Sequence, residues 1–190
     1  MQHITRKGNF DSGHRVMNEQ YKCFNLHGHT YLYELTFTFD TMETIGYALD
    51  FKEIKRVGCQ WIDDLMDHGM ILNPKDEKVI DTVKSLGTKL WLMSLNGRGE
   101  YCNPSVENIA REVLLAEYIL FEHYPLLEPT MVKIFETPNC WTECYYSQIP
   151  QIEKDNFYEQ HYEDIRAYAG GKGILEYDDR KSGFVEGTGV

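Results

Sequence analysis

Residues 30–41 constrain the fold of this 190-residue chain more than any other segment. Every second side chain in the segment is aromatic or aliphatic: Tyr31, Tyr33, Leu35, Phe37 and Phe39. Because successive side chains of a β-strand point to opposite faces, this period of two predicts a long strand with one buried face. Residues 4–16 are expected to form its antiparallel partner, across a loop that contains residues 21–26. The apolar face of such a pair requires a covering layer.

Two helices are predicted to supply that layer. The first would follow a capping Asp50, and its apolar residues recur at roughly helical spacing, with Gly58 weakening the middle: Phe51, Ile54, Trp61 and Leu65. The second would begin at Asn103 and Pro104, a capping residue followed by a proline in the first turn. Its apolar face would consist of Val106, Ile109, Val113 and Ile119.

The remaining strands are expected at residues 131–136 and 144–148, with a short one at 89–94. The main order is then strand, strand, helix, helix, strand, strand, which predicts an α+β domain: a four-stranded antiparallel sheet with two helices on one face. Residues 1–149 would form this domain. Residues 150–190 are acidic and Tyr-rich, then Gly-rich, and lack the apolar periodicity of the preceding part. We expect them to form an accessory C-terminal extension, helical near 156–168.

Composition excludes several classes of function. A formal net charge of −11 argues against a nucleic-acid or anionic-membrane surface, since binding to such surfaces requires a basic face. No apolar run approaches the roughly 20 residues that span a bilayer, and the start of the chain lacks the apolar core of a secretory signal. Five cysteines in irregular spacing fit a reducing compartment better than a disulfide framework. We therefore expect a cytoplasmic protein.

Three histidines suggest a metal site. His27 and His29 lie at the start of the predicted long strand, and an i, i+2 pair on a strand points both imidazoles to one face. His14 lies in the segment expected to pair with this strand, so it could supply a third nitrogen. Three histidines and one open position are typical of a catalytic zinc site. The pair alone would be a weak signal, since alternate histidines more often sit at a solvated strand edge.

Cys23 stands out because it lies four residues before His27. As a fourth zinc ligand, its thiolate would close the coordination sphere. As a buried loop cysteine it would be inert, which is the commonest fate of a thiol. Both alternatives remain open from the residues alone.

Two further positions could carry chemistry. Asp67 precedes His68 near the end of the first predicted helix, and a carboxylate can orient a histidine for proton transfer. The alternative is that His68 caps this helix before Gly69. Glu136 ends an apolar strand, where a ligand with adjacent N–H donors would satisfy its carboxylate; a surface turn is the simpler interpretation.

Together these motifs resemble the family of 6-pyruvoyl-tetrahydropterin and 6-carboxytetrahydropterin synthases. The resemblance covers residues 10–146 and its pieces follow the family order. They are Phe10-Asp11-Ser12-Gly13-His14-Arg15, Cys23 through His27-Gly28-His29, Gly46 through Asp50-Phe51, Asp67-His68, Asn103-Pro104-Ser105-Val106-Glu107-Asn108, and Glu136-Thr137-Pro138. The ordered set is far more specific than any single piece.

The resemblance implies roles for these residues. His14, His27 and His29 would bind Zn²⁺, Cys23 would be the proton-abstracting thiolate, and Asp67 with His68 would relay protons. Glu136 would anchor the pterin substrate and take part in that relay. The implied architecture is the tunnelling fold, whose subunits join their sheets into a barrel as a homo-oligomer, a hexamer by family resemblance, with active sites between subunits.

The resemblance also implies a reaction, in which 7,8-dihydroneopterin triphosphate is converted to a carboxytetrahydropterin, acetaldehyde and triphosphate. The four-residue step from Cys23 to His27 looks like the carboxytetrahydropterin branch of queuosine biosynthesis, since the pyruvoyl branch usually has a longer gap. Formation of pyruvoyltetrahydropterin is the nearest rival. A structural zinc module in a larger assembly is the rival from another class. The chain departs from the family in one extra residue after His68, in the long stretch 74–103 and in the extension.

Overall fold

The computed structural model describes residues 2–94 and 102–172, and its centre is one six-stranded mixed sheet. The strands lie in the order β4-β3-β1-β2-β5-β6. Their bounds are Gln2–His14 for β1, His27–Phe39 for β2, Gly69–Leu72 for β3, Leu90–Leu92 for β4, Glu128–Thr137 for β5 and Cys140–Tyr145 for β6. The α+β class predicted from the sequence is therefore confirmed.

The central hairpin is the one expected from the alternating segment. β1 and β2 pair antiparallel along their whole length, from Gln2 opposite Phe39 to His14 opposite His27. On the inner face, Tyr31, Leu35 and Phe37 are fully buried, as the period of two requires. The pair ends on the two histidines.

The sheet extends beyond the four antiparallel strands expected, which correspond to β1, β2, β5 and β6. β3 runs parallel to β1, and β4, the predicted short strand, runs parallel to β3. A parallel pair needs a long crossover, and the helical segment between β2 and β3 provides it. β3 has only four residues, so its sequence offers no alternation from which a strand could be predicted.

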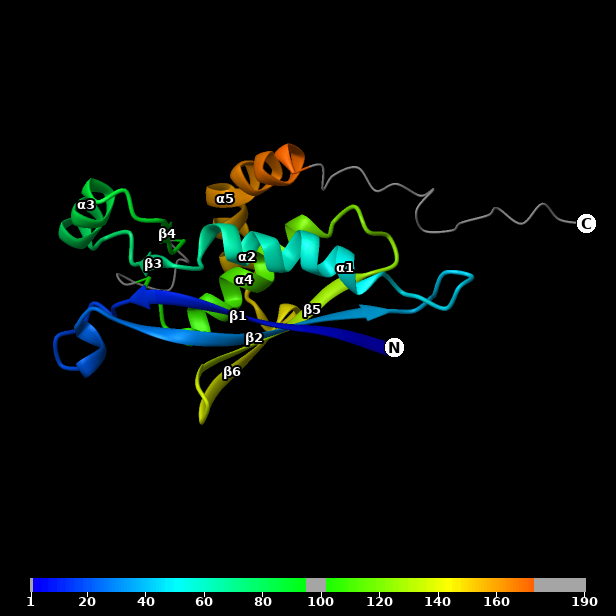
Figure 1. The fold of residues 1–190 in the computed structure, drawn as a ribbon, viewed down its shortest axis with the longest axis horizontal. Helices are drawn as coiled ribbons and strands as arrows, with labels where there is room; N and C mark the ends of the chain where they lie inside the picture. The colour runs from blue at the N-terminus through cyan, green and yellow to red at the C-terminus, as the bar shows by residue number, and fades with distance from the viewer. Residues whose placement is uncertain (1, 95–101, 173–190) are drawn as a thin grey trace, which may run out of the picture.

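The helices lie on one side of the hairpin (Figure 1). The first predicted helix is a continuous segment in three parts, α1 (Phe51–Ile54), a π-helical turn (Lys55–Cys59) and α2 (Gln60–Leu65). Asp50 caps it as expected, by accepting a hydrogen bond from the Lys52 N–H. A helix that was not predicted, α3 (Glu77–Ser85), packs Ile80 and Val83 against Leu72 of β3.

The second predicted helix, α4 (Val106–Leu120), crosses the sheet and is buried on nearly every side. It begins later than predicted, because Ser105 rather than Asn103 is its N-cap. Asn103 and Pro104 precede the helix in an extended turn, where their polar groups contact the end of β1. The turn formed by Asn103 and Pro104 therefore lies beside His14, one of the predicted metal ligands.

The extension contains a long helix, α5 (Gln151–Gly171), which packs against α4. Phe157, Ile165 and Ala169 are at most 2% exposed and belong to the same buried cluster as the hairpin residues. Residues 151–171 thus pack on the core, while residues 173–190 lie outside the described residues, and the accessory role of the extension stays a prediction. The domain boundary at residue 149 stays a prediction. No helix within 2–94 and 102–172 is both long and apolar enough to cross a bilayer.

The burial of Phe157 gives the first testable prediction. Phe157→Ala should lower the free energy of unfolding by about 3–5 kcal/mol, because it removes a fully buried ring and leaves a cavity. The matched control is Ile152→Ala on the same helix, whose side chain is 59% exposed and whose loss should cost no more than about 0.5 kcal/mol. Urea unfolding followed by circular dichroism measures both. Equal effects would mean that α5 does not dock on the core.

Candidate functional site

The predicted metal ligands meet at the end of the central hairpin. His14 on β1 lies opposite His27 on β2, and His29 lies two residues further along the same face. One ring nitrogen from each of the three histidines lies within 4.8 Å of the others. The Nε2 atoms of His14 and His27 are only 3.1 Å apart. The strand register alone therefore brings three imidazoles together.

Backbone carbonyls fix the tautomers of two of these rings. The Nδ1 of His14 lies 2.7 Å from the Pro104 carbonyl oxygen, and the Nδ1 of His27 lies 2.7 Å from that of Asn25. A carbonyl only accepts hydrogen bonds, so each Nδ1 carries a proton, and in the neutral ring the Nε2 presents a lone pair. Two such lone pairs at 3.1 Å repel unless a proton or a metal ion lies between them. This donor set fits a metal ion bound by imidazole nitrogens.

His14 is held in the neutral form that metal binding requires. Its side chain is 1% exposed, and burial lowers its pKa to about 4, with smaller contributions from the charges of His27 and His29. The hydrogen bond to Pro104 opposes this shift without cancelling it. The ring is therefore neutral throughout the physiological range.

Glu136 and Tyr31 complete the surroundings of the cluster. The Glu136 Oε1 lies 3.9 Å from the His14 Nε2 and 4.0 Å from the His29 Nε2. The Tyr31 ring stands edge-on to the His29 ring at 5.5 Å, and its buried hydroxyl has no hydrogen-bond partner among the described residues. Burial raises the pKa of Tyr31, and the charges of Glu136 and Cys23 add to the shift. Tyr31 is thus a neutral donor beside the site that sequence reasoning missed, although it continues the spacing of His27 and His29.

Cys23 lies on the loop between the paired strands, in a short 3-10 turn (Lys22–Phe24). Its side chain is exposed, and its sulfur is not part of the group of ligand atoms formed by the three histidines. The Cys23 carbonyl accepts a hydrogen bond from the Val16 N–H at 2.8 Å, which ties the loop to the end of β1. The described geometry gives no support to a closed site with Cys23 as the fourth ligand, nor to a buried, inert thiol.

Asp67 and His68 form the contact predicted for a proton relay. The His68 Nδ1 lies 2.6 Å from the Asp67 Oδ2, and the other carboxylate oxygen accepts from the Asp11 N–H at 2.7 Å. Partial burial of Asp67 is outweighed by these hydrogen bonds and by the charges of His68 and Lys89, so its pKa is lowered. His68 does not cap α2, which ends at Leu65 with Met66 as its C-cap. Instead its N–H donates to the Asp11 carbonyl, in a backbone conformation with φ of 55°.

A surface hollow lies beside the Asp67–His68 pair. It has a volume of about 380 Å³, and its lining includes His68 and His29. The remaining lining residues are Asp11, Ser12, Gly13, Gly28, Thr30 and Gly69. The structure therefore brings Glu136 to the histidine cluster, whereas Asp67 and His68 form a separate group with Asp11. Cys23 is not among the lining residues of this hollow.

Asn103 joins the site to the rest of the fold. Its Oδ1 accepts hydrogen bonds from the Met17 N–H at 2.9 Å and from the Asn73 side chain at 3.1 Å. Beside it, Arg15 forms a bidentate pair with buried Asp76, at 2.5 and 2.9 Å. These contacts hold the chain that follows His14 against the segment after β3 and the turn before α4.

Comparison with known proteins gives a consistent result. Residues 3–147 match the family model described as 6-pyruvoyl tetrahydropterin synthase. A protein of Rickettsia bellii named 6-carboxy-5,6,7,8-tetrahydropterin synthase is 36% identical over 141 residues, which cover 73% of this chain and 96% of the relative. A protein of the same name from Rickettsia conorii is 32% identical, with coverage of 73% and 96%. The solved structure of Caenorhabditis elegans 6-pyruvoyl tetrahydropterin synthase shares the fold, with a TM-score of 0.52, 19% identity and coverage of 76% and 94%.

The buried state of His14 gives a prediction for the metal-free protein. Its pKa is about 4 in the folded chain and about 6.5 in the unfolded chain, so between these values only the unfolded chain gains the proton. Stability should then fall as the pH falls, by about 2 kcal/mol between pH 7 and pH 5 from this group. His14→Gln, which can still donate to Pro104, should lose that part of the pH dependence.

Urea unfolding in the presence of a chelator measures this effect. His3→Gln is the matched control, because His3 is an exposed histidine on the same strand and should leave the pH dependence unchanged. If His14→Gln and wild type showed the same slope of stability against pH, the neutral, buried state of His14 would be wrong.

Proposed function

The chain belongs to the 6-pyruvoyl tetrahydropterin synthase family, and on that premise we propose that it is a zinc-dependent 6-carboxy-5,6,7,8-tetrahydropterin synthase. Its substrate would be 7,8-dihydroneopterin triphosphate, and its products a carboxytetrahydropterin, acetaldehyde and triphosphate. The observation that carries the proposal is the pair of Nε2 atoms 3.1 Å apart, in two rings whose Nδ1 atoms each lie 2.7 Å from a backbone carbonyl oxygen.

His14, His27 and His29 would hold the zinc ion. Three imidazole ligands leave one of the four usual positions of zinc open, as catalytic sites require. Bound zinc would act as a Lewis acid that lowers the pKa of the substrate's side-chain hydroxyl groups. Among the residues that the structure describes, no fourth protein ligand atom belongs to the cluster of the three histidines, which favours an open site over a structural zinc module.

The protein's own groups have separate tasks in this proposal. Cys23, exposed on its loop, would take the proton from the activated carbon of the substrate. His68 would pass protons onward, since Asp67 occupies its Nδ1 and leaves the Nε2 to exchange them. Glu136 would accept hydrogen bonds from adjacent N–H groups of the pterin ring, which fixes the ring beside the histidine cluster.

The arrangement of these groups also favours assembly. The side chain of His68 is 77% exposed, and Cys23 is exposed as well, so neither is shielded from water in one chain. Proton transfer gains from exclusion of water. We propose a homo-oligomer, a hexamer by analogy with the family, whose neighbouring subunits cover the site and complete a barrel. A cytoplasmic location would agree with five cysteines that form no disulfide in the described part of the chain.

Two considerations favour the carboxy product over the pyruvoyl product. The Rickettsia relatives carry the carboxytetrahydropterin name, and the spacing from Cys23 to His27 matches that branch. The pathway would then be that of queuosine and related 7-deazapurines. The pyruvoyl activity is the alternative, since both reactions share the elimination of triphosphate.

Incubation of the zinc-loaded protein with 7,8-dihydroneopterin triphosphate tests the proposal. Wild type should release acetaldehyde and form the carboxytetrahydropterin, detected by mass. Cys23→Ala should still bind pterin but turn over about 10²–10⁴-fold more slowly, because it lacks the group that takes the proton. Cys140→Ala, at another exposed cysteine, is the matched control and should remain active.

Three other results of this experiment would support an alternative function or refute the role of Cys23. The pyruvoyl product without acetaldehyde would contradict the carboxy branch. Tight zinc binding with neither product would favour the structural module, and full activity in Cys23→Ala would refute the role of the thiol.

A further inference from the structure

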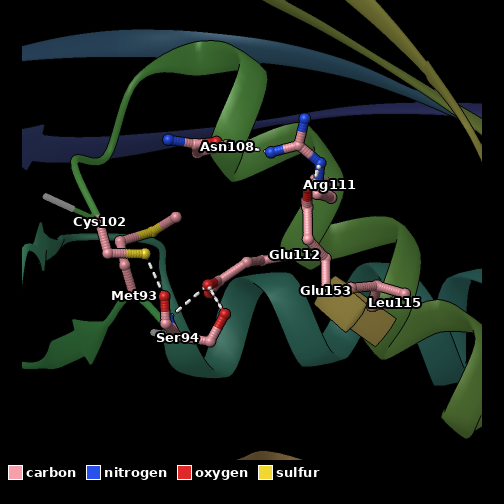
Figure 2. A pocket seen from close by; sticks show the side chains of 8 residues that line it. All are labelled: Met93, Ser94, Cys102, Asn108, Arg111, Glu112, Leu115 and Glu153. Atoms are coloured by element: carbon pink, nitrogen blue, oxygen red, sulfur yellow. Dashed lines mark hydrogen bonds and ion pairs between the residues drawn. The ribbon is translucent and has the colours of Figure 1, made fainter. Parts of the chain in front are cut away.

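A buried ion pair joins the C-terminal helix to α4. The Glu153 Oε2 lies 2.9 Å from the Arg111 Nε, and the Glu153 side chain is 1% exposed. Figure 2 shows Arg111 between Glu153 on one side and Asn108 on the other. Glu153 lies beyond residues 3–147, which match the family model, so the acidic partner comes from the extension of this chain. Burial of two charges is costly, and apolar residues of similar size often stabilise a core equally well.

Arg111 determines the orientation of the neighbouring amide. Its Nη1 donates to the Asn108 Oδ1 at 2.6 Å. A guanidinium can only donate, so the oxygen of the amide must face Arg111 and its NH₂ group must face the other way. That NH₂ group donates to the Asn103 carbonyl at 2.9 Å. An Asn108 side chain without Arg111 could rotate and present its oxygen to that carbonyl instead.

Asn108 holds the turn that contains Pro104 from both sides. Its side chain binds the carbonyl before Pro104, and its backbone N–H donates to the Oγ of Ser105, the residue after it, at 3.5 Å. The proline ring fixes φ of Pro104 itself. With both neighbours held, the direction of the Pro104 carbonyl is determined. This carbonyl is the one that lies 2.7 Å from the His14 Nδ1.

We propose that Glu153 is a positioning residue for the metal ligand His14. The contacts run from Glu153 through Arg111, Asn108 and the Asn103–Pro104 turn to the His14 ring. Groups that orient a metal-bound histidine change metal affinity without touching the ion. The role rests on the zinc site proposed above. By this role, a residue of the C-terminal extension would affect a metal site that is formed by β1 and β2.

Zinc affinity of the full-length protein, measured by competition with a chromophoric chelator, tests this role. Glu153→Gln keeps the size of the side chain and removes its charge; we expect the Kd for zinc to rise about three- to tenfold, below the 10–100-fold typical of groups that contact the ligand directly. Asn108→Ala, closer to the ligand, should raise it by about tenfold or more. Because both act through the same contacts, the double variant should be little worse than Asn108→Ala alone.

The matched control is Glu122→Gln. Glu122 accepts hydrogen bonds from Tyr162 and Arg166 of α5, so this change weakens the docking of the same helix. Among the described residues, Glu122 has no hydrogen bond to Arg111, Asn108 or the Asn103–Pro104 turn. Its Kd for zinc should stay within twofold of wild type. Thermal unfolding of each metal-free variant separates loss of affinity from loss of fold. If Glu153→Gln does not fold, Arg111→Lys replaces it, since lysine keeps the charge but cannot bridge Asn108 and Glu153.

Each outcome decides the matter. An unchanged Kd in the folded variant, additive effects in the double variant, or an equal rise in Glu122→Gln would overturn the positioning role. Failure of wild type to bind one zinc ion per chain would instead overturn the proposed zinc site, so the two failures are distinguishable.

Discussion

The hydrogen bond between the His14 ring and the Pro104 carbonyl connects parts of the chain that are 90 residues apart. It ties the end of β1 to the turn that starts α4, and it selects the tautomer in which the Nε2 of His14 is free to bind. Both groups are buried, so loss of either partner would leave an unsatisfied polar group at a cost of about 1–3 kcal/mol. The contact therefore links the turn that starts α4 to the orientation of a proposed zinc ligand.

The sheet and the helices contribute different groups to the candidate site. The hairpin supplies the histidines, through a register that is fixed along thirteen residue pairs. The helical layer supplies the groups that orient them, from the turn before α4 and, by our proposal, from Glu153 on α5. The Asp67–His68 pair is attached to β1, because the backbone N–H and carbonyl of Asp11 form hydrogen bonds with Asp67 and His68.

The sequence predicts those features that repeat or that depend on strand register. The alternation of residues 31–39 predicted the hairpin, and the hairpin predicted that His14 would meet His27 and His29. It could not predict the Pro104 and Asn25 carbonyls, because every residue carries the same backbone group. The four-residue β3 is too short for a period. One stripe of α5 faces the core at every fourth residue: Glu153, Phe157, His161, Ile165 and Ala169. Its two polar members, Glu153 and His161, interrupt the apolar pattern from which the helix could have been predicted.

The central claim is that three histidines and no cysteine bind zinc, with one position open. X-ray absorption spectroscopy of the zinc-loaded, full-length protein at the zinc edge tests it most directly, because nitrogen and sulfur ligands differ in distance and in scattering. The account predicts three imidazole nitrogens at about 2.0–2.1 Å and one further light atom from water. A sulfur ligand at about 2.3 Å would place Cys23 or another thiol in the coordination sphere and contradict it.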